Sequence, residues 1–364
     1  MRVWNGIALG ALALAAIVGC NGGGGDNTSA ATAGSTATAN GTAGGKGTGL
    51  KSLKITMIAK SNNNPVFQSA KVGAEKAAAD LTKETGCQIS IDWQTPETED
   101  GQVQAQKIQQ AANEGANAIL ISCSDASKVK GAIDDAVDKG IPVMTFDSDA
   151  PDSKRFAFYG ADDTAVGVQV MDELAKAANG QQLQVAILAG NQTAPNLKKR
   201  AQGVIDEAKK YPNVHIVETF HHKETPQDAT AEVQRDNLAY PKINAWAMVG
   251  GWPLFNSALL SLDPAKYKIV AVDALPAELP YVDKGIAPVL LAQPTFDWGY
   301  KSVGFIVDKL VKGKNVDTIN VMQLVRVSKD NLGDWAKQLK DWGMPGIDPK
   351  YLNMPSAKSD ASKK

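Results

Sequence analysis

The segment KITMIAKSNNNPVFQ, residues 54–68, carries the pattern that decides the fold. Its first half contains a short apolar run, residues 55–59, typical of a strand that is covered on both faces of a parallel sheet. The run ends at Lys60, and Asn64, which precedes a proline, is a typical helix N-cap. Because open α/β sheets bind ligands beyond the carboxyl ends of their strands, we expect Lys60, Asn64 and Phe67 to lie at a binding site.

The same plan repeats along the chain, where apolar runs alternate with segments whose apolar residues recur every three or four positions. Strand, helix and strand in sequence predict an α/β fold with parallel sheets and right-handed crossovers. About 290 residues lie between two polar ends, near the size at which one core divides, so two lobes are expected. Strands are predicted at residues 54–59, 88–93, 117–122, 142–146, 156–159, 183–189, 213–219, 244–249, 267–272, 287–292 and 320–327.

The N-terminal region is predicted to be an export signal followed by a tether. Residues 1–19 hold a basic residue and an apolar run too short for a comfortable membrane span. The run ends in Ile-Val-Gly-Cys, which resembles the lipobox of bacterial lipoproteins, in which the cysteine is acylated. Cys20 could instead be a buried structural cysteine, but signal, small residue and cysteine together favour lipidation. Residues 20–52, rich in Gly, Ala, Ser, Thr and Asn, are expected to be flexible, and residues 346–364 to form a polar tail.

The charge balance argues against nucleic acid as a partner, and the placement of the cysteines argues against a disulfide. Lys plus Arg number 38 and Asp plus Glu 39, giving a net charge of −1 without any basic block, which argues against a nucleic-acid partner. Cys87 should lie at the start of the second strand and Cys123 at the end of the third. In the usual strand order another strand separates them, so free thiols are expected rather than a disulfide.

Polar and aromatic side chains follow most of the predicted strands. Any one of them is more often a loop or cap residue than a ligand contact, but their convergence on one sheet edge predicts a site. Carboxylates, amides and aromatic faces together suit a small neutral molecule with several hydroxyls. Beyond the first strand, the candidates are Ser122, Asp147, Asn196, Lys198, Trp252, Asp273 and Gln293.

At these positions the chain resembles the substrate-binding proteins of bacterial ABC transporters for sugars, in particular the ribose-binding type. The resemblance covers about residues 53–342, and each motif is weak alone but the order is specific. The motifs are NNPVF at 63–67, GANAILIS at 115–122, GIPVMTFD at 140–147, KRAQG at 199–203, IVAVD at 269–273 and AQ at 292–293.

The resemblance implies the type I periplasmic binding protein fold, two Rossmann-like lobes joined by three crossing strands with the ligand between them. The crossings are expected near residues 159–162, 293–294 and 320–321. The N-terminal lobe would then comprise residues 53–160 and 294–320, and the C-terminal lobe residues 161–293 and 321–345.

The resemblance also implies roles for individual residues. Asn64, Asp147, Asp273 and Gln293 match positions that hydrogen-bond sugar hydroxyls, and Phe67 matches an aromatic that stacks on the sugar ring. Several positions depart from the ribose type and argue against ribose itself: Val66, Ser148, Lys198 and the pair Gly251-Trp252. Lys60 and residues 145–149 look more like the autoinducer-2 and rhamnose receptors of the same superfamily.

Enzymatic readings find little support. The chain has no P-loop, no Gly-x-Gly-x-x-Gly after a strand and no Gly-x-Ser-x-Gly elbow, so no enzyme and no cofactor are expected. His221, His222 and Glu224 could ligate a metal, but a polar cleft edge or solvated loop is the preferred interpretation. Lys60 could be a ligand contact, a solvated charge or an ion-pair partner of Asp147.

Together these patterns predict an exported, lipid-anchored, monomeric protein. It would face the periplasm or the cell exterior, bind a small sugar or polyol by hinge closure and deliver it to an ABC permease. A sensory receptor that presents a sugar or an autoinducer-2-like ligand to a chemoreceptor or kinase is the alternative. A transcription regulator of this fold would need a DNA-binding segment where the signal and tether stand.

We expect Cys20→Ser to release the protein from the membrane without changing ligand affinity. Two acyl chains anchor a protein stably, and a tether of about 30 Gly-rich residues decouples the anchor from the binding domain. Membrane fractionation and calorimetric titration check this. Full membrane retention of the variant would contradict the prediction.

Overall fold

The computed structural model describes residues 48–355, which form two lobes, each built on a six-stranded sheet. The predicted signal, Cys20, most of the tether and the last residues of the chain lie outside the described residues. The two parallel-sheet lobes confirm the predicted fold class. Among the described residues, no helix has both the length and the apolar character needed to cross a membrane.

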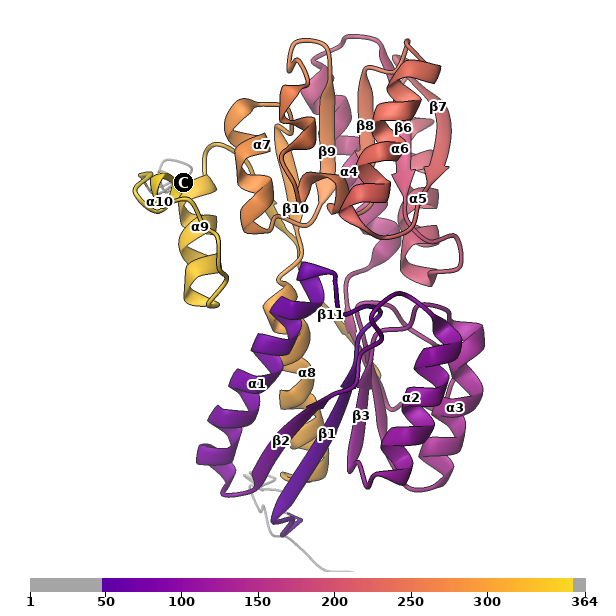
Figure 1. Cartoon of the computed structure of the whole chain (residues 1–364), viewed down its shortest axis with the longest axis vertical. Helices are drawn as coiled ribbons and strands as arrows, with labels where there is room; N and C mark the ends of the chain where they lie inside the picture. Colours follow the sequence, from indigo (N-terminus) through magenta and orange to yellow (C-terminus); the bar gives the residue numbers. More distant parts are fainter. Residues whose placement is uncertain (1–47, 356–364) are drawn as a thin grey trace, which may run out of the picture. The chain divides into compact units, whose positions relative to one another are not determined.

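The sheet of the first lobe is wholly parallel, with strand order β11-β5-β4-β3-β1-β2. Helices α1 (Pro65–Thr85) and α8 (Thr295–Leu310) lie side by side on one face, and α2 (Gly101–Asn113) and α3 (Ala126–Asp138) cover the other (Figure 1). The strands are β1 (Ser52–Ile58), β2 (Gln88–Trp93), β3 (Ala118–Ile121), β4 (Val143–Phe146), β5 (Ala157–Gly160) and β11 (Ile319–Val321).

The second lobe repeats this plan with strand order β12-β10-β9-β8-β6-β7. Its strands are β6 (Leu183–Ala189), β7 (Val214–His221), β8 (Ala245–Met248), β9 (Lys268–Val272), β10 (Val289–Ala292) and β12 (Val325–Val327). One face packs against α4 (Asp163–Ala178) and α5 (Pro195–Ala208), and the other against α6 (Pro226–Ala239), α7 (Leu279–Lys284) and α9 (Leu332–Asp341). The short helices are η1 (Trp252–Leu254), η2 (Ala258–Ser261), η3 (Pro276–Glu278) and α10 (Pro349–Leu352).

The prediction of one strand at residues 320–327 was wrong. The segment is split into β11, which pairs with β5 in the first sheet, and β12, which pairs with β10 in the second. β12 also runs antiparallel to β10, against the expectation of purely parallel sheets. The physical reason is its approach: β12 enters its sheet directly from the other lobe, without a helical crossover, and so starts where the parallel strands end.

Three short links join the lobes. The first, residues 161–162, connects β5 to α4, and the second, residues 293–294, connects β10 to α8. The third comprises residues 322–324, slightly later than expected, since Asn320 and Val321 still belong to β11. Two lobes that share only such links are suited to relative rotation.

The decisive segment folds as its pattern predicts. Residues 55–59 are fully buried, with Ile55 and Met57 in the core beneath α1 and α8 while Ile58 packs on the α2 and α3 side. Asn64 caps α1, accepting a hydrogen bond from the backbone N–H of Val66 at 3.2 Å. Strand burial on both faces and helix capping together place the residues after Lys60 at the carboxyl edge of the sheet.

The ordered domain extends further at both ends than predicted. The backbone N–H of Thr48, inside the expected tether, donates to the carbonyl of Val311 at 2.9 Å. The first part of the expected polar tail forms α10, whose Tyr351 is fully buried in the core of the second lobe. Tyr351, together with the partly buried Ile347, Leu352 and Met354, therefore provides the apolar surface that docks this segment.

Both described cysteines are free and buried. Cys87 precedes β2 and Cys123 follows β3, and β1 lies between those two strands. Burial raises the pKa of both thiols, so neither is a reactive thiolate at neutral pH.

Each lobe contains a helix pair that approaches through glycines. In the first lobe, a Cβ at Gly73 would overlap the carbonyl of Phe296 and one at Gly299 would overlap that of Ala70. In the second lobe, Gly167 and Gly203 play the same part between α4 and α5. A methyl group at such a site would push the helices apart, because packed cores have no space to take it up.

We expect Gly299→Ala to lower the free energy of unfolding by about 1–3 kcal/mol through overpacking. The matched control is Gly304→Ala on the same helix, where a Cβ would meet no atom within 4 Å. There the better helix propensity of alanine should stabilise the protein by up to about 1 kcal/mol. Urea denaturation measures both, and equal shifts in the two variants would contradict close helix packing at Gly299.

Candidate functional site

Two aspartates occupy equivalent positions in the two lobes. Asp147 follows β4 and Asp273 follows β9, each the third strand from the same edge of its sheet. Both have left-handed backbone conformations, with φ of 57° for Asp147 and 81° for Asp273. Aspartate tolerates this region better than most residues, but it remains an uncommon conformation that clusters at functional sites. Each residue also donates its backbone N–H to the neighbouring strand, which holds the turn in place.

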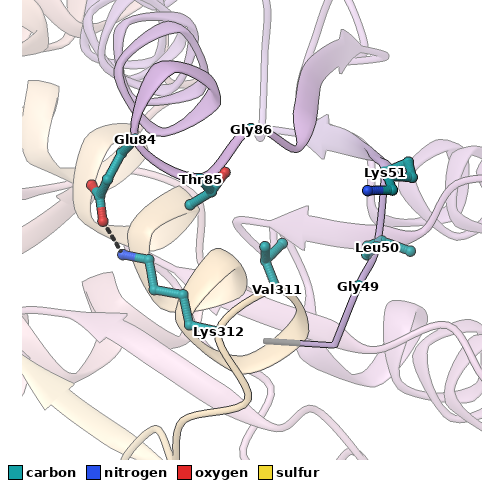
Figure 2. A pocket seen from close by; sticks show the side chains of 8 residues that line it. All are labelled: Gly49, Leu50, Lys51, Glu84, Thr85, Gly86, Val311 and Lys312. Carbon is teal, nitrogen blue, oxygen red and sulfur yellow. Dashed lines mark ion pairs between the residues drawn. The ribbon is translucent and has the colours of Figure 1, made fainter. Parts of the chain in front are cut away.

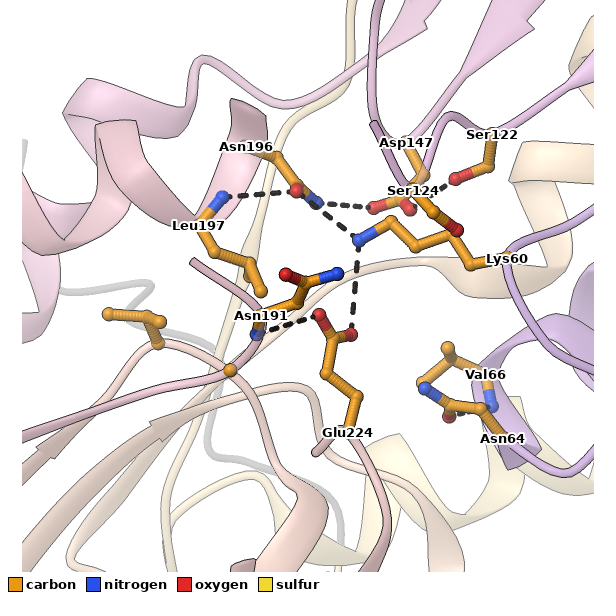
Figure 3. A network of polar contacts seen from close by, with 12 residues as sticks. Lys60, Asn64, Val66, Ser122, Ser124, Asp147, Asn191, Asn196, Leu197 and Glu224 are labelled. Atoms are coloured by element: carbon orange, nitrogen blue, oxygen red, sulfur yellow. Dashed lines mark hydrogen bonds and ion pairs between the residues drawn. The ribbon is translucent and has the colours of Figure 1, made fainter. Parts of the chain in front are cut away.

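Asp147 is buried and hydrogen-bonded from both lobes. Its Oδ2 accepts from the hydroxyl of Ser122 at 2.7 Å, within the first lobe (Figure 3). Its Oδ1 accepts from the Nδ2 of Asn196 at 3.2 Å, and Asn196 belongs to α5 of the second lobe. The carboxylate therefore bridges the lobes through a side-chain amide.

Lys60 contributes a fully enclosed cation beside this bridge. Its Nζ donates to the Oδ1 of Asn196 at 3.3 Å and lies 3.8 Å from the Oε2 of Glu224 (Figure 3). Burial disfavours the charged ammonium, but the surrounding carboxylates, Glu224 foremost, outweigh this and raise the pKa of Lys60. The ion pair with Asp147 that the sequence left open is replaced by one with Glu224, because β7 and its following loop bring that carboxylate closer.

Arg200 organises the second lobe's side of the site. Its guanidinium donates to Asp163 at 2.8 Å, to the Oε1 of Gln293 at 2.9 Å and to the carbonyl of Val249 at 3.2 Å. Gln293 in turn donates from Nε2 to Asp273 at 2.8 Å. This chain orients the Gln293 amide and sets the Asp273 carboxylate, whose other oxygen accepts from the backbone of Gly251 at 3.3 Å.

Aromatic rings form the apolar wall of the site. Phe67 packs between Phe146, edge-on at 6.4 Å, and Trp298, stacked at 6.1 Å between ring centroids. Trp252, on η1 of the second lobe, is buried against the edge of His222 at 5.0 Å. Rings of this kind provide flat apolar faces for a ligand while polar groups fix its orientation.

Most of the predicted site residues meet around one enclosed cavity between the lobes, the inner cavity, of about 20 Å³. They are Lys60, Asn64, Phe67, Asp147, Asn196, Trp252, Asp273 and Gln293. Ser122 lies behind Asp147 rather than on the wall. The small volume reflects side chains that pair with one another across the cavity.

Lys198 was predicted at the site but is exposed and does not line the inner cavity. The reason is helix geometry: positions 196, 197 and 200 of α5 face inward, whereas 198 points away at about 100° per residue. Arg200, two positions later, is the buried cation instead.

Three further wall residues, Arg200, Glu224 and Trp298, are not among the predicted ligand contacts. Arg200 stands in the quoted KRAQG motif, and the amphipathic pattern of α5 would have turned it inward. Glu224 is expected at a polar cleft edge or in a solvated loop, with a metal ligand as the alternative. Within residues 48–355 no grouping of three or more potential metal ligands occurs.

A larger hollow, the outer cavity, of about 1040 Å³, adjoins the inner one and shares Glu224 with it. It is lined by the loop after β2 and by the loops after β6 and β7, and it includes Glu99, His221 and His222.

A third hollow, of about 470 Å³, lies at the amino ends of the first lobe's strands, between residues 49–51, the end of α1 and Lys312 (Figure 2). Its labelled residues include one ion pair, Lys312 with Glu84 at 2.8 Å. Because α/β sheets bind ligands at the carboxyl ends of their strands, this hollow is not the candidate site.

Comparisons with known proteins agree with this architecture. A family model described as "Periplasmic binding protein domain" matches residues 55–315. The ribose import binding protein RbsB of Bacillus subtilis (strain 168) is 29% identical over 157 residues, 42% of this chain and 48% of the relative. The match therefore spans about half of that protein's length.

Solved structures cover more of the chain. An ABC transporter solute-binding protein from Burkholderia graminis, crystallised with D-arabinose, is 25% identical with a TM-score of 0.70, covering 77% of this chain and 96% of its own. A chain of the XylFII-LytSN complex is 26% identical with a TM-score of 0.68, covering 76% and 98%.

We expect Arg200→Met to destabilise the protein by about 3–5 kcal/mol at pH 8, because Asp163 is left buried without its cation. Burial raises the pKa of Asp163 even beside Arg200, and loss of the cation would raise it further. A carboxyl group whose pKa is raised on folding is unfavourable above that pKa, so the deficit should shrink as the pH falls to 5.

Urea denaturation at several pH values measures this effect. Lys198→Met is the matched control, since an exposed lysine on the same helix should change stability by less than about 0.5 kcal/mol. A similar loss of unfolding free energy in both variants would contradict the interpretation that Arg200 stabilises the buried carboxylate of Asp163.

Proposed function

This chain belongs to the periplasmic binding protein family, and on that premise we propose that it is the substrate-binding protein of an ABC transporter. It binds a small polyhydroxylated ligand, a monosaccharide in the first instance, between its lobes and delivers it to a permease. The ribose and arabinose named for two similar proteins support this ligand class. Family membership also supports export of the protein from the cytoplasm.

The observation that carries the proposal is the convergence of buried hydrogen-bonding groups from both lobes on the inner cavity. Asp147 comes from the first lobe, and Asn196, Asp273 and Gln293 come from the second or its link. Carboxylates accept hydrogen bonds from neighbouring hydroxyls, and amides both donate and accept, as a sugar does. The flanking ring of Phe67 supplies an apolar face.

Ligand binding would act by closure. Asp147 and Lys60 of the first lobe bond to Asn196 of the second, so these groups can satisfy one another across the inner cavity. A ligand whose hydroxyls replace these bonds contacts both lobes and gains affinity only in the closed state, which shifts the population toward it. The closed pair of lobes then forms the surface that a permease recognises. The chemistry is binding, and no covalent step is proposed.

Membrane attachment belongs to the same proposal. Acylation of Cys20 would hold the protein at the membrane surface, and the low-complexity segment after it would let the binding domain reach the permease. A monomer is sufficient, because the residues of the inner cavity all come from one chain.

A sensory role is the second candidate, supported by the similarity to a chain of the XylFII-LytSN complex. The ligand site would be the same, and the closed lobes would contact a receptor in place of a permease. Crosslinking of the ligand-bound protein in its native membrane, followed by identification of the partner, separates the two functions.

A thermal-shift screen against monosaccharides, polyols and autoinducer-2 identifies the ligand. A ligand at 100-fold its dissociation constant adds roughly 2.7 kcal/mol to stability, which is readily measured.

For the ligand found, Asp147→Asn and Asp147→Ala should each weaken binding at least tenfold, about 1.4 kcal/mol. The carboxylate forms charge-assisted bonds to hydroxyls in a closed, dry site, and its loss leaves those hydroxyls unpaired. Calorimetric titration measures the affinity, and thermal unfolding of the variants separately measures the stability lost with the hydrogen bonds from Ser122 and Asn196. Near-wild-type affinity in both variants would exclude Asp147 from the site.

A further inference from the structure

The boundary between the inner and outer cavities contains hydrogen-bond acceptors that lack donors. Both carboxylate oxygens of Glu99, on the loop between β2 and α2, are shielded from solvent, and the side chain at hydrogen-bonding distance is another carboxyl group, that of Glu224. Two ionised carboxylates cannot donate to one another, and a buried acceptor without a donor costs free energy. A group that donates hydrogen bonds would therefore be favoured at Glu99.

His222 provides a second, independent acceptor. Its ring is 9% exposed, and its Nδ1 lies 2.5 Å from the backbone carbonyl of Lys223, which requires a proton on Nδ1. Burial lowers the pKa of His222, which keeps the ring neutral at pH 7 and leaves Nε2 as an acceptor. That Nε2 is buried and has no partner. Glu99 and His222 both line the outer cavity.

The charges around the two cavities do not balance. Apart from the exposed Glu97 and Lys223, the carboxyl groups that line the two cavities are those of Asp147, Asp273, Glu224 and Glu99, against the two cations Lys60 and Arg200. Arg200 is further committed to a fifth carboxylate, that of Asp163, at 2.8 Å. Lys60 is the cation nearest to Glu224, at 3.8 Å. Among the described residues, carboxyl groups therefore outnumber cations around the two cavities, and a cationic group would favour the ionised form of these carboxyl groups.

We propose that the ligand carries a protonated primary amine, as an amino sugar does, and that Glu99, Glu224 and the Nε2 of His222 bind this ammonium group. An ammonium group has three donors and no acceptor, which matches a cluster made only of acceptors. Glu224 lines both cavities, so a sugar ring held at Asp147 and Gln293 could direct an amine toward it. This inference rests on the proposed function, since it names the class of sugar.

Two other occupants of the cluster are chemically conceivable and are distinguished by experiment. A neutral hydroxyl donates one hydrogen bond and leaves the charge excess in place. A divalent metal ion would use the same imidazole and carboxylates, although no potential metal-ligand group of three or more occurs in residues 48–355.

Amine binding should be coupled to proton release. Burial and the nearby Glu224 raise the pKa of Glu99, which favours the protonated form of this carboxyl group. The other charged groups facing Glu99 are Lys60, which lowers its pKa, and Asp147, which raises it, while His222 is neutral. An incoming ammonium favours the ionised carboxylate and expels the proton, so affinity for the amine should fall as the pH is lowered.

The test compares matched ligands on the tether-free protein by calorimetric titration at pH 7. The pairs are D-glucose with D-glucosamine, D-galactose with D-galactosamine and D-mannose with D-mannosamine, and N-acetyl-D-glucosamine serves as the uncharged amide control. We expect at least one amino sugar to bind at least tenfold more tightly than its neutral counterpart and N-acetyl-D-glucosamine to lack this gain. Titration in buffers of different ionisation enthalpy should show proton release with the amine alone.

Glu99→Gln should reduce the amine preference to less than threefold, because the amide removes the negative charge while keeping the shape. Glu97→Gln, on the same loop but exposed, is the matched control and should leave the preference within threefold of wild type, since solvent screens its charge. Equal loss of preference in both variants would overturn specific binding at Glu99.

The remaining outcomes separate the two levels of the proposal. Neutral sugars that bind as tightly as their amines would overturn the amine inference and leave the proposed function intact. If no sugar or amino sugar binds, both proposals fail. Titration with Zn²⁺ alone covers the third case: tight binding that Glu99→Gln abolishes would make the cluster a metal site and overturn the amine.

Discussion

The burial of charged side chains at the carboxyl ends of two sheets is the constraint on which the rest of the site depends. A buried charge is tolerated only with a partner and hydrogen bonds, so each cation in this region commits its neighbours to defined positions. Arg200 fixes Asp163 and Gln293, and through Gln293 it fixes Asp273. The orientation of the ligand-facing amide is thus a consequence of satisfying one guanidinium.

The two lobes share two structural features. Each places an aspartate in a left-handed conformation after the third strand from the same sheet edge, and each closes its main helix pair through glycines. Glycine contacts make the lobes stiff, while the links between them are only a few residues long. Relative rotation of the lobes would therefore be taken up by the links, which is the arrangement that rigid-body closure requires.

The polar groups between the lobes have two sets of partners available. They pair with one another across the inner cavity, as Lys60, Asn196 and Asp147 do (Figure 3). A ligand competes with these internal bonds, so its net affinity is the difference between two well-satisfied networks. Ligand specificity then depends on polar groups that find no hydrogen-bond donor within this internal network. Glu99 and His222 are such groups in the described part of the chain.

The sequence by itself determined the features that depend on near neighbours. Periodicity located ten of the twelve described strands, the Asn64 cap followed from residue type, and the carboxyl-end rule identified eight of the residues around the inner cavity. These predictions are correct because strand burial, helix starts and sheet edges depend on the local sequence pattern. The fold class followed from their order.

Only the tertiary structure decided which distant groups pair. In the tertiary structure Arg200, and not Lys198, is the buried cation of α5, and Lys60 pairs with Glu224 instead of Asp147. Residues 320–327 are divided between two sheets, and Tyr351 is buried in the second lobe. Each outcome depends on the packing of elements far apart in the chain, because a buried charge or ring is stabilised by whichever partner the fold brings within a few ångströms. Residue type at one position carries no information about that distance.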